Sequence, residues 1–283
     1  MSHTSGRCKN VSGHSRQKEI VHDKHGPHNG GRLPHIQRGE HFPGECYTSH
    51  GSNSDNLEVK GHDFDFIHLR CPWSSPEPCS CGRHSYHLDS MIVAVDGACP
   101  GNGSHKAVAS GCGVWFGPRS ANSDNHTIQP NLSFRVPDDP IHPHTSQRAE
   151  LHAAIAGLES STKFAMHGGQ FKCEVPDNCP EPCRLAHLII KSDSAYIVNA
   201  MTGSIWKWQK NGWLTTNKTL VKNRDLWDKL LDAYYVLEKL NVSVDFWHVP
   251  REQNAEADSL ARQGVNSRYT YGDGLLCFNI WCL

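Results

Sequence analysis

Between residues 91 and 263 the sequence alternates short apolar runs with longer amphipathic runs, in an order that few folds accommodate. The first three runs have the length and the apolar or alternating pattern of strands. A strand meander followed by alternating helices and strands predicts a mixed sheet covered by helices, which is an α/β fold. The expected strands are residues 91–96, 108–116, 127–135, 187–192 and 242–249. The expected helices are residues 145–162, 194–201, 223–239 and 254–263.

The segment before this pattern has a different composition. Residues 1–88 hold 12 of the 20 histidines, with many Gly, Ser, Asp and Lys residues and little periodic apolar character. Such a composition cannot bury a core of its own and predicts a His/Cys-rich extension of low order. We therefore assign residues 89–266 to one folded domain and residues 267–283 to a C-terminal tail, so a chain that starts near residue 88 is expected to fold. The stretch FDFIHL (64–69) is a candidate for packing on the domain, and residues 168–184 are interpreted as a loop insertion.

Charge and cysteine content narrow the classes of partner. The net charge of −1 and the pI of about 7.0 show no basic excess, so a nucleic-acid partner requires a local basic patch. The sequence has neither an apolar run of the roughly 18 residues that a membrane span needs nor an apolar signal segment at its start. We therefore expect an intracellular protein of the nucleus or cytoplasm, with its twelve cysteines reduced. Two cysteine clusters lack CxxC spacing but keep metal binding open as an alternative. They are Cys71, Cys79 and Cys81, and Cys173, Cys179 and Cys183.

Four carboxylates fall where the expected elements could bring them together. Asp96 ends the first strand and Asp193 ends the fourth, while Glu150 lies in the first helix and Asp258 in the last. If the two strands are parallel neighbours, Asp96 and Asp193 lie side by side at the edge where such sheets bind ligands. Carboxylates this close cannot all ionise unless cations neutralise them, and oxygen-only ligation suits Mg²⁺ or Mn²⁺. The sequence thus predicts a metal site that could activate a water and stabilise a leaving oxygen on phosphorus.

Four segments, taken together and in this order, resemble type 1 ribonuclease H. They are VDGACPGNG, TSQRAELHA, KSDSAYIVNAMTGSIWKWQKNGW and HVPREQNAEADSLAR, the last of which is similar to fungal and other variant members. The resemblance implies a mixed five-stranded sheet with helices on both faces. It implies an endonuclease that hydrolyses the RNA strand of RNA–DNA hybrids with two Mg²⁺ or Mn²⁺ ions, and we expect a monomer. The catalytic and metal-binding residues implied by the resemblance are Asp96, Glu150, Asp193 and Asp258.

The resemblance also implies two regions that contact the hybrid. The glycine-rich loop after Asp96 would let the backbone approach a sugar–phosphate chain and, with Asn102, touch the 2′-hydroxyls that distinguish RNA from DNA. Residues 205–224 carry five basic side chains and no acidic one, interleaved with tryptophans, and would grip the DNA strand. The implied contact residues are Gly97, Cys99, Gly101 and Asn102 in the loop, Lys207, Trp208 and Lys210 in the basic stretch, Gln147 at the minor groove, and Thr145 and Asn211 at a DNA phosphate.

One departure from the family pattern leaves the mechanism open. Many relatives carry a glycine-rich loop with a histidine between the last strand and the last helix, but only REQN separates HVP from AEAD here. His248 matches a packed strand histidine and not the missing one. The alternatives are an active but slower enzyme, with Glu252 as a candidate substitute, or a hybrid-binding module with little activity. An exonuclease or integrase-like domain on the same fold would lack the tryptophan–lysine stretch.

Overall fold

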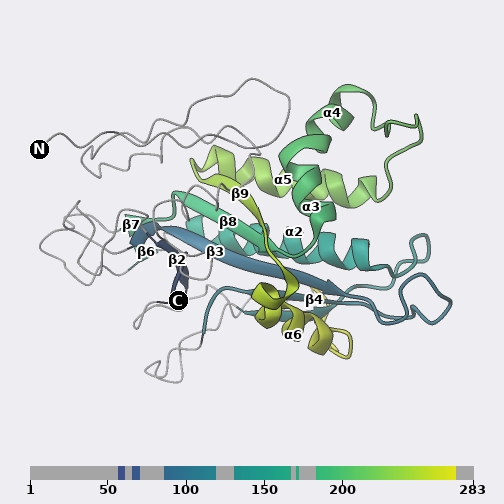
Figure 1. Ribbon diagram of the computed structural model, residues 1–283, viewed down its shortest axis with the longest axis horizontal. Coiled ribbons are helices and arrows are strands. Elements are labelled where there is room, and N and C mark those ends of the chain that lie inside the picture. Colours follow the sequence, from purple (N-terminus) through teal and green to yellow (C-terminus); the bar gives the residue numbers. More distant parts are fainter. Residues whose placement is uncertain are drawn as a thin grey trace, which may run out of the picture.

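The computed structural model describes residues 57–60, 66–70, 86–118, 131–166, 170–171 and 183–271. These residues form one seven-stranded sheet with helices on both of its faces, and a separate pair of two-residue strands (Figure 1). The strands are β1 (Glu58–Lys60), β2 (Ile67–Arg70), β3 (Tyr86–Ala98), β4 (Gly111–Trp115), β5 (Leu132–Arg135), β6 (Gln170–Phe171), β7 (Cys183–Arg184), β8 (His187–Ser192) and β9 (Ser243–His248). The helices are α2 (Ser146–Met166), α3 (Ala195–Asn199), the π-helical turn η3 (Ala200–Ser204), α4 (Ile205–Lys210), α5 (Arg224–Lys239), the 3₁₀ turn η4 (Arg251–Asn254) and α6 (Ala255–Gly264).

Strand β3 is the centre of the sheet because it has three neighbours. Strand β8 runs parallel to it along Ser90–Ala94, and β9 runs parallel to β8. Strand β2 pairs antiparallel with the first half of β3, and β4 pairs antiparallel with the second half. A strand has two edges, so β2 and β4 must share the edge opposite β8, and Ile67 N donates to Phe116 O at 3.0 Å where they meet.

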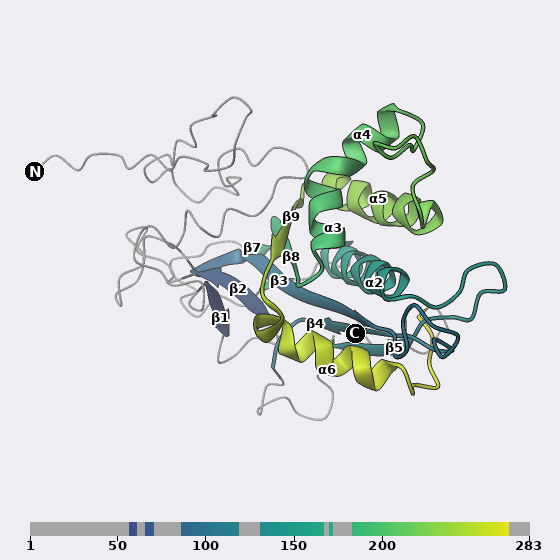
Figure 2. The same cartoon turned by 45° about the vertical axis from the view of Figure 1, so that its right-hand side comes forward.

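The side chains of β3 alternate between two hydrophobic cores, as the period-2 geometry of a strand requires. Met91, Val93 and Val95 belong to the larger core, which includes the buried face of α2. Ile92 and Ala94 face the smaller core, to which α6 contributes Ala257. Helix α5 packs on α2, and Figure 2 shows α6 on the opposite face of the sheet. Both faces of β3 are therefore buried, which explains its near-continuous apolar sequence.

Two glycines let helices approach the sheet at the ends of the central strands. A Cβ atom on Gly113 of β4 would lie 2.1 Å from Ala257 O, so only glycine lets α6 cross this strand. A Cβ atom on Gly97 of β3 would lie 2.2 Å from Glu150 N, so the first turns of α2 cross directly over this position. Gly97 thus has a packing role that brings α2 next to the residue that precedes it, Asp96.

The element order expected from the sequence is confirmed for the described part of residues 89–266. Strands β3, β4, β5, β8 and β9 and helices α2, α5 and α6 each overlap their expected ranges, with ends that differ by a few residues. The helix expected at 194–201 is longer, because the chain passes through the π-helical turn η3 directly into α4. Strands β6 and β7 pair with each other at the base of the segment interpreted as an insertion.

Two strands add to the five expected ones, and they bear on the expected start of the domain, which stays a prediction. The sheet has seven strands and not five, because β1 and β2 come from the segment assigned to the extension. Leu57, Ile67 and Leu69 are fully buried in the smaller core, so this part of the segment does bury a core, together with the domain. The proposed boundary at residue 88 also cuts through β3, which begins at Tyr86.

Some expectations concern residues outside the described ranges. Of the six clustered cysteines, only Cys183, in β7, lies within the described ranges, and the other five lie outside them. Cys99 and Cys112 are described and carry free thiols. In the described ranges, no helix has the length and apolar content that crossing a membrane would require.

Candidate active site

The four predicted acidic residues come from four elements that meet at one edge of the sheet. Asp96 lies in β3, and Asp193 directly follows β8, its parallel neighbour. Glu150 lies in the second turn of α2, where this helix crosses Gly97. Asp258 lies in the first turn of α6, which packs against β3 and β4. The parallel register expected between the two aspartate-bearing strands is confirmed.

Asp96 is the most perturbed of the four carboxylates. It is 7% exposed, and burial raises its pKa from 3.8 to about 7, with further increases from the negative charges of Asp193 and then Asp258. A hydrogen bond from the Gly97 backbone opposes the shift, as does the more distant Arg251. The negative charges of Asp193 and Asp258 thus disfavour ionisation of Asp96 at this edge of the sheet, as sequence reasoning predicts.

Glu150 is held in place by a serine. Ser194 Oγ donates a hydrogen bond to Glu150 Oε2 at 2.5 Å. Burial raises the pKa of Glu150, the Ser194 hydrogen bond opposes this, and the charge of Asp193 raises it further. Because Ser194 directly follows Asp193 and also caps helix α3, the end of β8 orients two of the four carboxylates.

Asp193 is braced by a buried asparagine that links α6 to the sheet. Asn254 Nδ2 donates to Asp193 Oδ1 at 3.0 Å and to the backbone oxygen of Val95 at 3.0 Å. The Asn254 side chain is fully buried, and its Oδ1 has no hydrogen-bond partner. On the other side, His248 Nε2 lies 3.3 Å from Asp193 O, so this histidine contacts the backbone and not the carboxylate.

Replacing Asn254 with alanine should destabilise the protein by about 1–3 kcal/mol, because it leaves the buried Val95 carbonyl and Asp193 with one donor fewer. Asn254→Asp should cost more, since it places another carboxylate against Asp193. Urea unfolding at fixed pH measures both effects, with Asn266→Ala, an exposed site in the same region, as the control. An unchanged midpoint for Asn254→Ala would mean that the two hydrogen bonds do not hold α6 on the sheet.

Asp258 is bound by two arginines that sequence reasoning did not identify. Arg251 of η4 donates to Asp258 Oδ1, and Arg262 Nε lies 2.9 Å from Asp258 Oδ2. The pKa of Arg251 is raised by the negative charge of Asp258 first, and further by Asp96 and Asp193. Arg251 thus faces three of the four carboxylates. The sequence pattern does not single out Arg251, because its neighbour Glu252 is the better candidate for a role in catalysis.

The donor set fits a divalent ion of the Mg²⁺ class, although the side chains are not yet arranged around one. Four carboxylates, of which Asp193 and Asp258 each raise the pKa of Asp96, provide hard oxygen ligands and surplus negative charge. The orphaned, buried Oδ1 of Asn254 adds a further oxygen beside Asp193. In the described ranges, however, no three His, Cys, Asp or Glu side chains are grouped closely enough to ligate one ion. Ser194, Asn254 and the two arginines hold the carboxylates in this arrangement.

The glycine-rich loop after β3 is tied to the start of α2. Gly101 and Gly103 have φ values of 73° and 78°, which side chains other than glycine rarely adopt. Asn102 Oδ1 accepts a hydrogen bond from Ser146 N at 3.0 Å, and Thr145 Oγ1 accepts one from Arg148 N at 3.2 Å. The structure therefore brings five of the implied contact residues together around the N-terminus of α2. They are Cys99, Gly101, Asn102, Thr145 and Gln147.

Of the remaining implied contact residues, Lys207, Trp208 and Lys210 lie on α4 and Asn211 directly follows it, away from the carboxylates. Lys207 and Lys210 are exposed, whereas Trp208 is half-buried and packs against Trp213 and Trp227, with ring centroids 6.4 and 5.8 Å apart. Asn211 is committed to the turn that follows, since its side chain accepts from Leu214 N and donates to Leu214 O. The lysines are therefore the members of this group that are free to meet a ligand.

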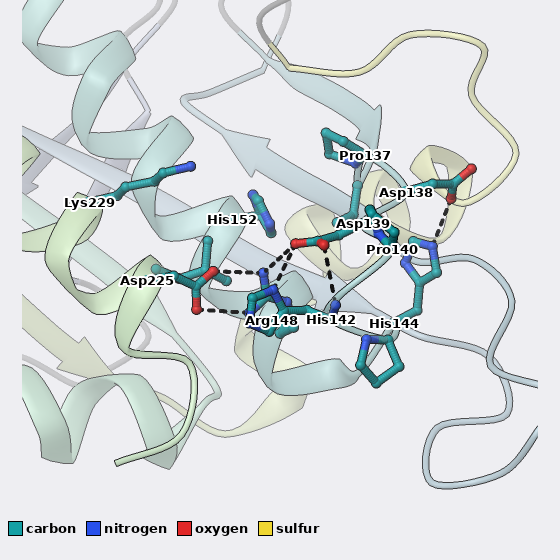
Figure 3. Close-up of a pocket in the computed structure, with 13 residues that line it drawn as sticks. Pro137, Asp138, Asp139, Pro140, His142, His144, Arg148, His152, Asp225 and Lys229 are labelled. Atoms are coloured by element: carbon teal, nitrogen blue, oxygen red, sulfur yellow. Dashed lines mark hydrogen bonds and ion pairs between the residues drawn. The ribbon is translucent and has the colours of Figure 1, made fainter. Parts of the chain in front are cut away.

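A polar pocket of about 240 Å³ lies beside α2 on the side away from Glu150 (Figure 3). Arg148 and His152 are each two positions from Glu150, which is a rotation of roughly 200° about the helix. Arg148 donates to both carboxylate oxygens of Asp225, at 3.0 and 2.9 Å, and so joins α2 to α5. Burial lowers the pKa of His152 to about 4, with Arg148 and then Lys229 lowering it further. The pocket mixes both signs of charge, and its clearest role is structural.

The fold and the site together define an RNase H-like α/β protein, with a mixed sheet, helices on both faces and acidic residues at the ends of adjacent central strands. A family model described as RNase H matches residues 89–266, which is more than half of the chain. The chain therefore belongs to the RNase H family. This confirms the family resemblance and the fold class expected from the sequence.

Similarity extends to individual relatives. Ribonuclease H1 of Homo sapiens is 30% identical over 204 residues, which cover 70% of this chain and 58% of that protein. Ribonuclease H of Schizosaccharomyces pombe is 32% identical over 228 residues, which cover 78% of this chain and 72% of that protein. The crystal structure of LC11-RNase H1 in complex with RNA/DNA hybrid matches with 22% identity and a TM-score of 0.38, over 62% of this chain and 96% of that one. The chain spans 52–58% of the length of the mammalian relatives.

Proposed function

We propose that this protein is an endonuclease that hydrolyses the RNA strand of RNA–DNA hybrids with two divalent ions. The observation that carries the proposal is the buried Asp96 of β3, whose pKa is raised by the charges of Asp193, at the end of β8, and of Asp258, within a chain of the RNase H family. Relatives with the name ribonuclease H support the reaction, and one solved relative was crystallised with an RNA/DNA hybrid. We further propose that it acts as a monomer inside the cell, where such hybrids form.

Asp96, Glu150, Asp193 and Asp258 would hold the two Mg²⁺ or Mn²⁺ ions. When bound, the ions would lower the pKa of a water and neutralise the leaving oxygen on phosphorus. The chain itself has three tasks. Asp96 would be a ligand in its ionised form, since bound cations would offset the burial and the neighbouring negative charges that raise its pKa. Ser194 orients Glu150, and Asn254 orients Asp193.

The glycine loop supports a preference for RNA as the strand that is cut. Apart from Gly103 and its two chain neighbours, no atom of the described residues lies within 4 Å of the position that a Cβ would take at Gly103, so a sugar–phosphate chain could approach the backbone of this loop closely. Asn102 lies in this loop, where its amide could reach a 2′-hydroxyl, the group that distinguishes RNA from DNA. Its present hydrogen bond to Ser146 N holds the loop against α2 and so limits its freedom before the hybrid binds.

Replacing Lys207 and Lys210 of α4 with alanine should weaken hybrid binding and reduce its dependence on salt. Each lysine that neutralises a phosphate contributes a salt slope of about one, so the double variant should lose about two. Fluorescence anisotropy measures hybrid binding between about 50 and 200 mM salt. Lys239→Ala, at the last residue of α5, is the control. An unchanged slope would show that these lysines do not contact the DNA strand.

One experiment tests the proposal directly. Labelled RNA–DNA hybrid, duplex RNA and duplex DNA are incubated with the full chain, with Mg²⁺, with Mn²⁺ and with EDTA. We expect internal cuts in the RNA of the hybrid alone, only with a divalent ion, and more slowly than in relatives that carry the histidine loop, because a general acid or base contributes a factor of about 10² to 10⁴. Tight hybrid binding without cleavage under either ion would instead favour a hybrid-binding module.

A further inference from the structure

The contact between Arg251 and Asp258 has a consequence for metal binding that rests on the proposed function. Asp258 is 13% exposed at its side chain and is engaged from both sides, by Arg251 at Oδ1 and by Arg262 at Oδ2. Both of its oxygens therefore have cationic partners. A divalent ion at Asp258 would have to displace at least one of them, since two positive charges cannot share one carboxylate oxygen without repulsion.

The two arginines are not equivalent in position. Arg262 lies four residues after Asp258 on α6, so its ion pair is the ordinary contact of neighbouring helical turns. Arg251 reaches Asp258 from η4, outside the helix, and its charge is also felt by Asp96 and Asp193. Arg251 thus interacts electrostatically with three of the four carboxylates, whereas Arg262 pairs with Asp258 from within the same helix.

We propose that Arg251 is an internal counter-ion that occupies the carboxylate site in the metal-free protein and competes with the divalent ion for Asp258. The ion displaces the Arg251 guanidinium, whose side chain is 62% exposed and so can move into solvent without a desolvation cost. The contact sets a threshold concentration of divalent ion, below which the site stays closed by its own arginine.

Competition of this kind is reciprocal, so removing Arg251 should strengthen binding of the ion by the amount that the ion weakens the ion pair. Partly exposed ion pairs contribute up to about 1 kcal/mol, which corresponds to about a fivefold change in an equilibrium constant. We therefore expect Arg251→Gln to bind Mn²⁺ about two- to fivefold more tightly than the natural protein. Arg251→Lys, which keeps the charge but lacks the planar fork, should lie between the two.

The test measures binding of Mn²⁺ alone to the full chain, by calorimetry and by counting free Mn²⁺ from its paramagnetic resonance, without nucleic acid. Arg268→Gln is the matched control, because it removes the same charge from an exposed position of the same C-terminal region. Arg262→Gln is the internal comparison and should change the affinity less than Arg251→Gln does. The thermal shift produced by saturating Mn²⁺ should also be larger in Arg251→Gln than in the natural protein.

The outcomes separate this inference from the proposed function. Tighter binding in Arg251→Gln, with Arg268→Gln unchanged, supports the competition. Equal Mn²⁺ affinity in Arg251→Gln and the natural protein overturns it, while measurable binding and cleavage leave the proposed function standing. If neither protein binds Mn²⁺, removing the arginine has opened no site, and the competition is again overturned. Should hybrid cleavage also be absent in that case, the proposed function fails with it.

Discussion

Replacing Asp96 with asparagine should abolish hybrid cleavage and, at the same time, stabilise the metal-free protein. The loss of cleavage follows because Asp96 is the carboxylate most central to the proposed ion site. The gain in stability follows from its pKa, which rises from 3.8 to about 7 in the folded protein through burial and repulsion. A carboxyl whose pKa is raised by folding costs stability once the pH exceeds its unfolded value, and that cost grows until the pH passes the folded value.

The size of this effect can be bounded. Three pKa units correspond to about 4 kcal/mol, which is an upper limit because the neighbouring aspartates relax and solvent screens them. We expect Asp96→Asn to gain about 1–4 kcal/mol in free energy of unfolding at pH 8 in EDTA, and much less at pH 4. Asp228→Asn, at an exposed position of α5, is the control and should change stability by less than about 0.5 kcal/mol.

Two results would contradict this prediction. Substantial cleavage by Asp96→Asn would remove Asp96 from the catalytic group. Equal stability of the variant and the natural protein at both pH values would show that the carboxylates do not repel one another in the metal-free state.

A chain that starts at residue 89 should fail to fold, contrary to the expectation from composition alone. It would lack β1 and β2 and the first residues of β3, and with them the fully buried Leu57, Ile67 and Leu69. Each such side chain contributes roughly 1.5–3 kcal/mol, so the three together approach the whole stability of an ordinary domain, about 5–15 kcal/mol. Circular dichroism and urea unfolding of this shortened chain, compared with the full chain, measure the loss.

The same prediction can be tested without shortening the chain. Glu58 of β1 forms an ion pair with Lys191 of β8. The Lys191 side chain is 5% exposed, and its Nζ lies 5.9 Å from the centre of the Trp247 ring. Glu58→Gln leaves a buried lysine without its counter-charge and should cost about 3–5 kcal/mol. The double variant Glu58→Leu, Lys191→Met should recover most of that loss. A stable chain from residue 89 and a neutral Glu58→Gln would together show that β1 and β2 are dispensable.

The sequence predicts those elements whose own pattern determines them. Strand β8 was expected at its observed residues, because six buried positions in a row leave few alternatives. Strand β1 has only three residues, two of them charged, and forms because β2 and the rest of the sheet are already there. Short strands of this kind depend on tertiary pairing, which no local pattern records.

In the site, too, the sequence predicts which acidic residues meet but not which partners hold them. Asp96 and Asp193 could be paired from the sequence because each ends a strand, and parallel strands end at the same edge. The partners of these carboxylates could not be predicted from the sequence. Ser194, Asn254 and Arg251 are ordinary polar residues, and only the folded backbone brings them to the carboxylates. The length of the turn between β9 and α6 decides whether an arginine faces solvent or Asp258, and that geometry is set by packing.

Strand β3 and helix α6 lie far apart in the sequence, yet they pack against each other and the site needs both. Asp96 is made early in synthesis, whereas Arg251, Asn254 and Asp258 are among the last described residues to leave the ribosome. A nascent chain that stops before η4 would carry three acidic residues with neither the asparagine brace nor the arginine counter-ion. The site is thus complete only in a chain that extends through α6, and a product that ends before η4 would lack Asp258 together with the residues that hold it.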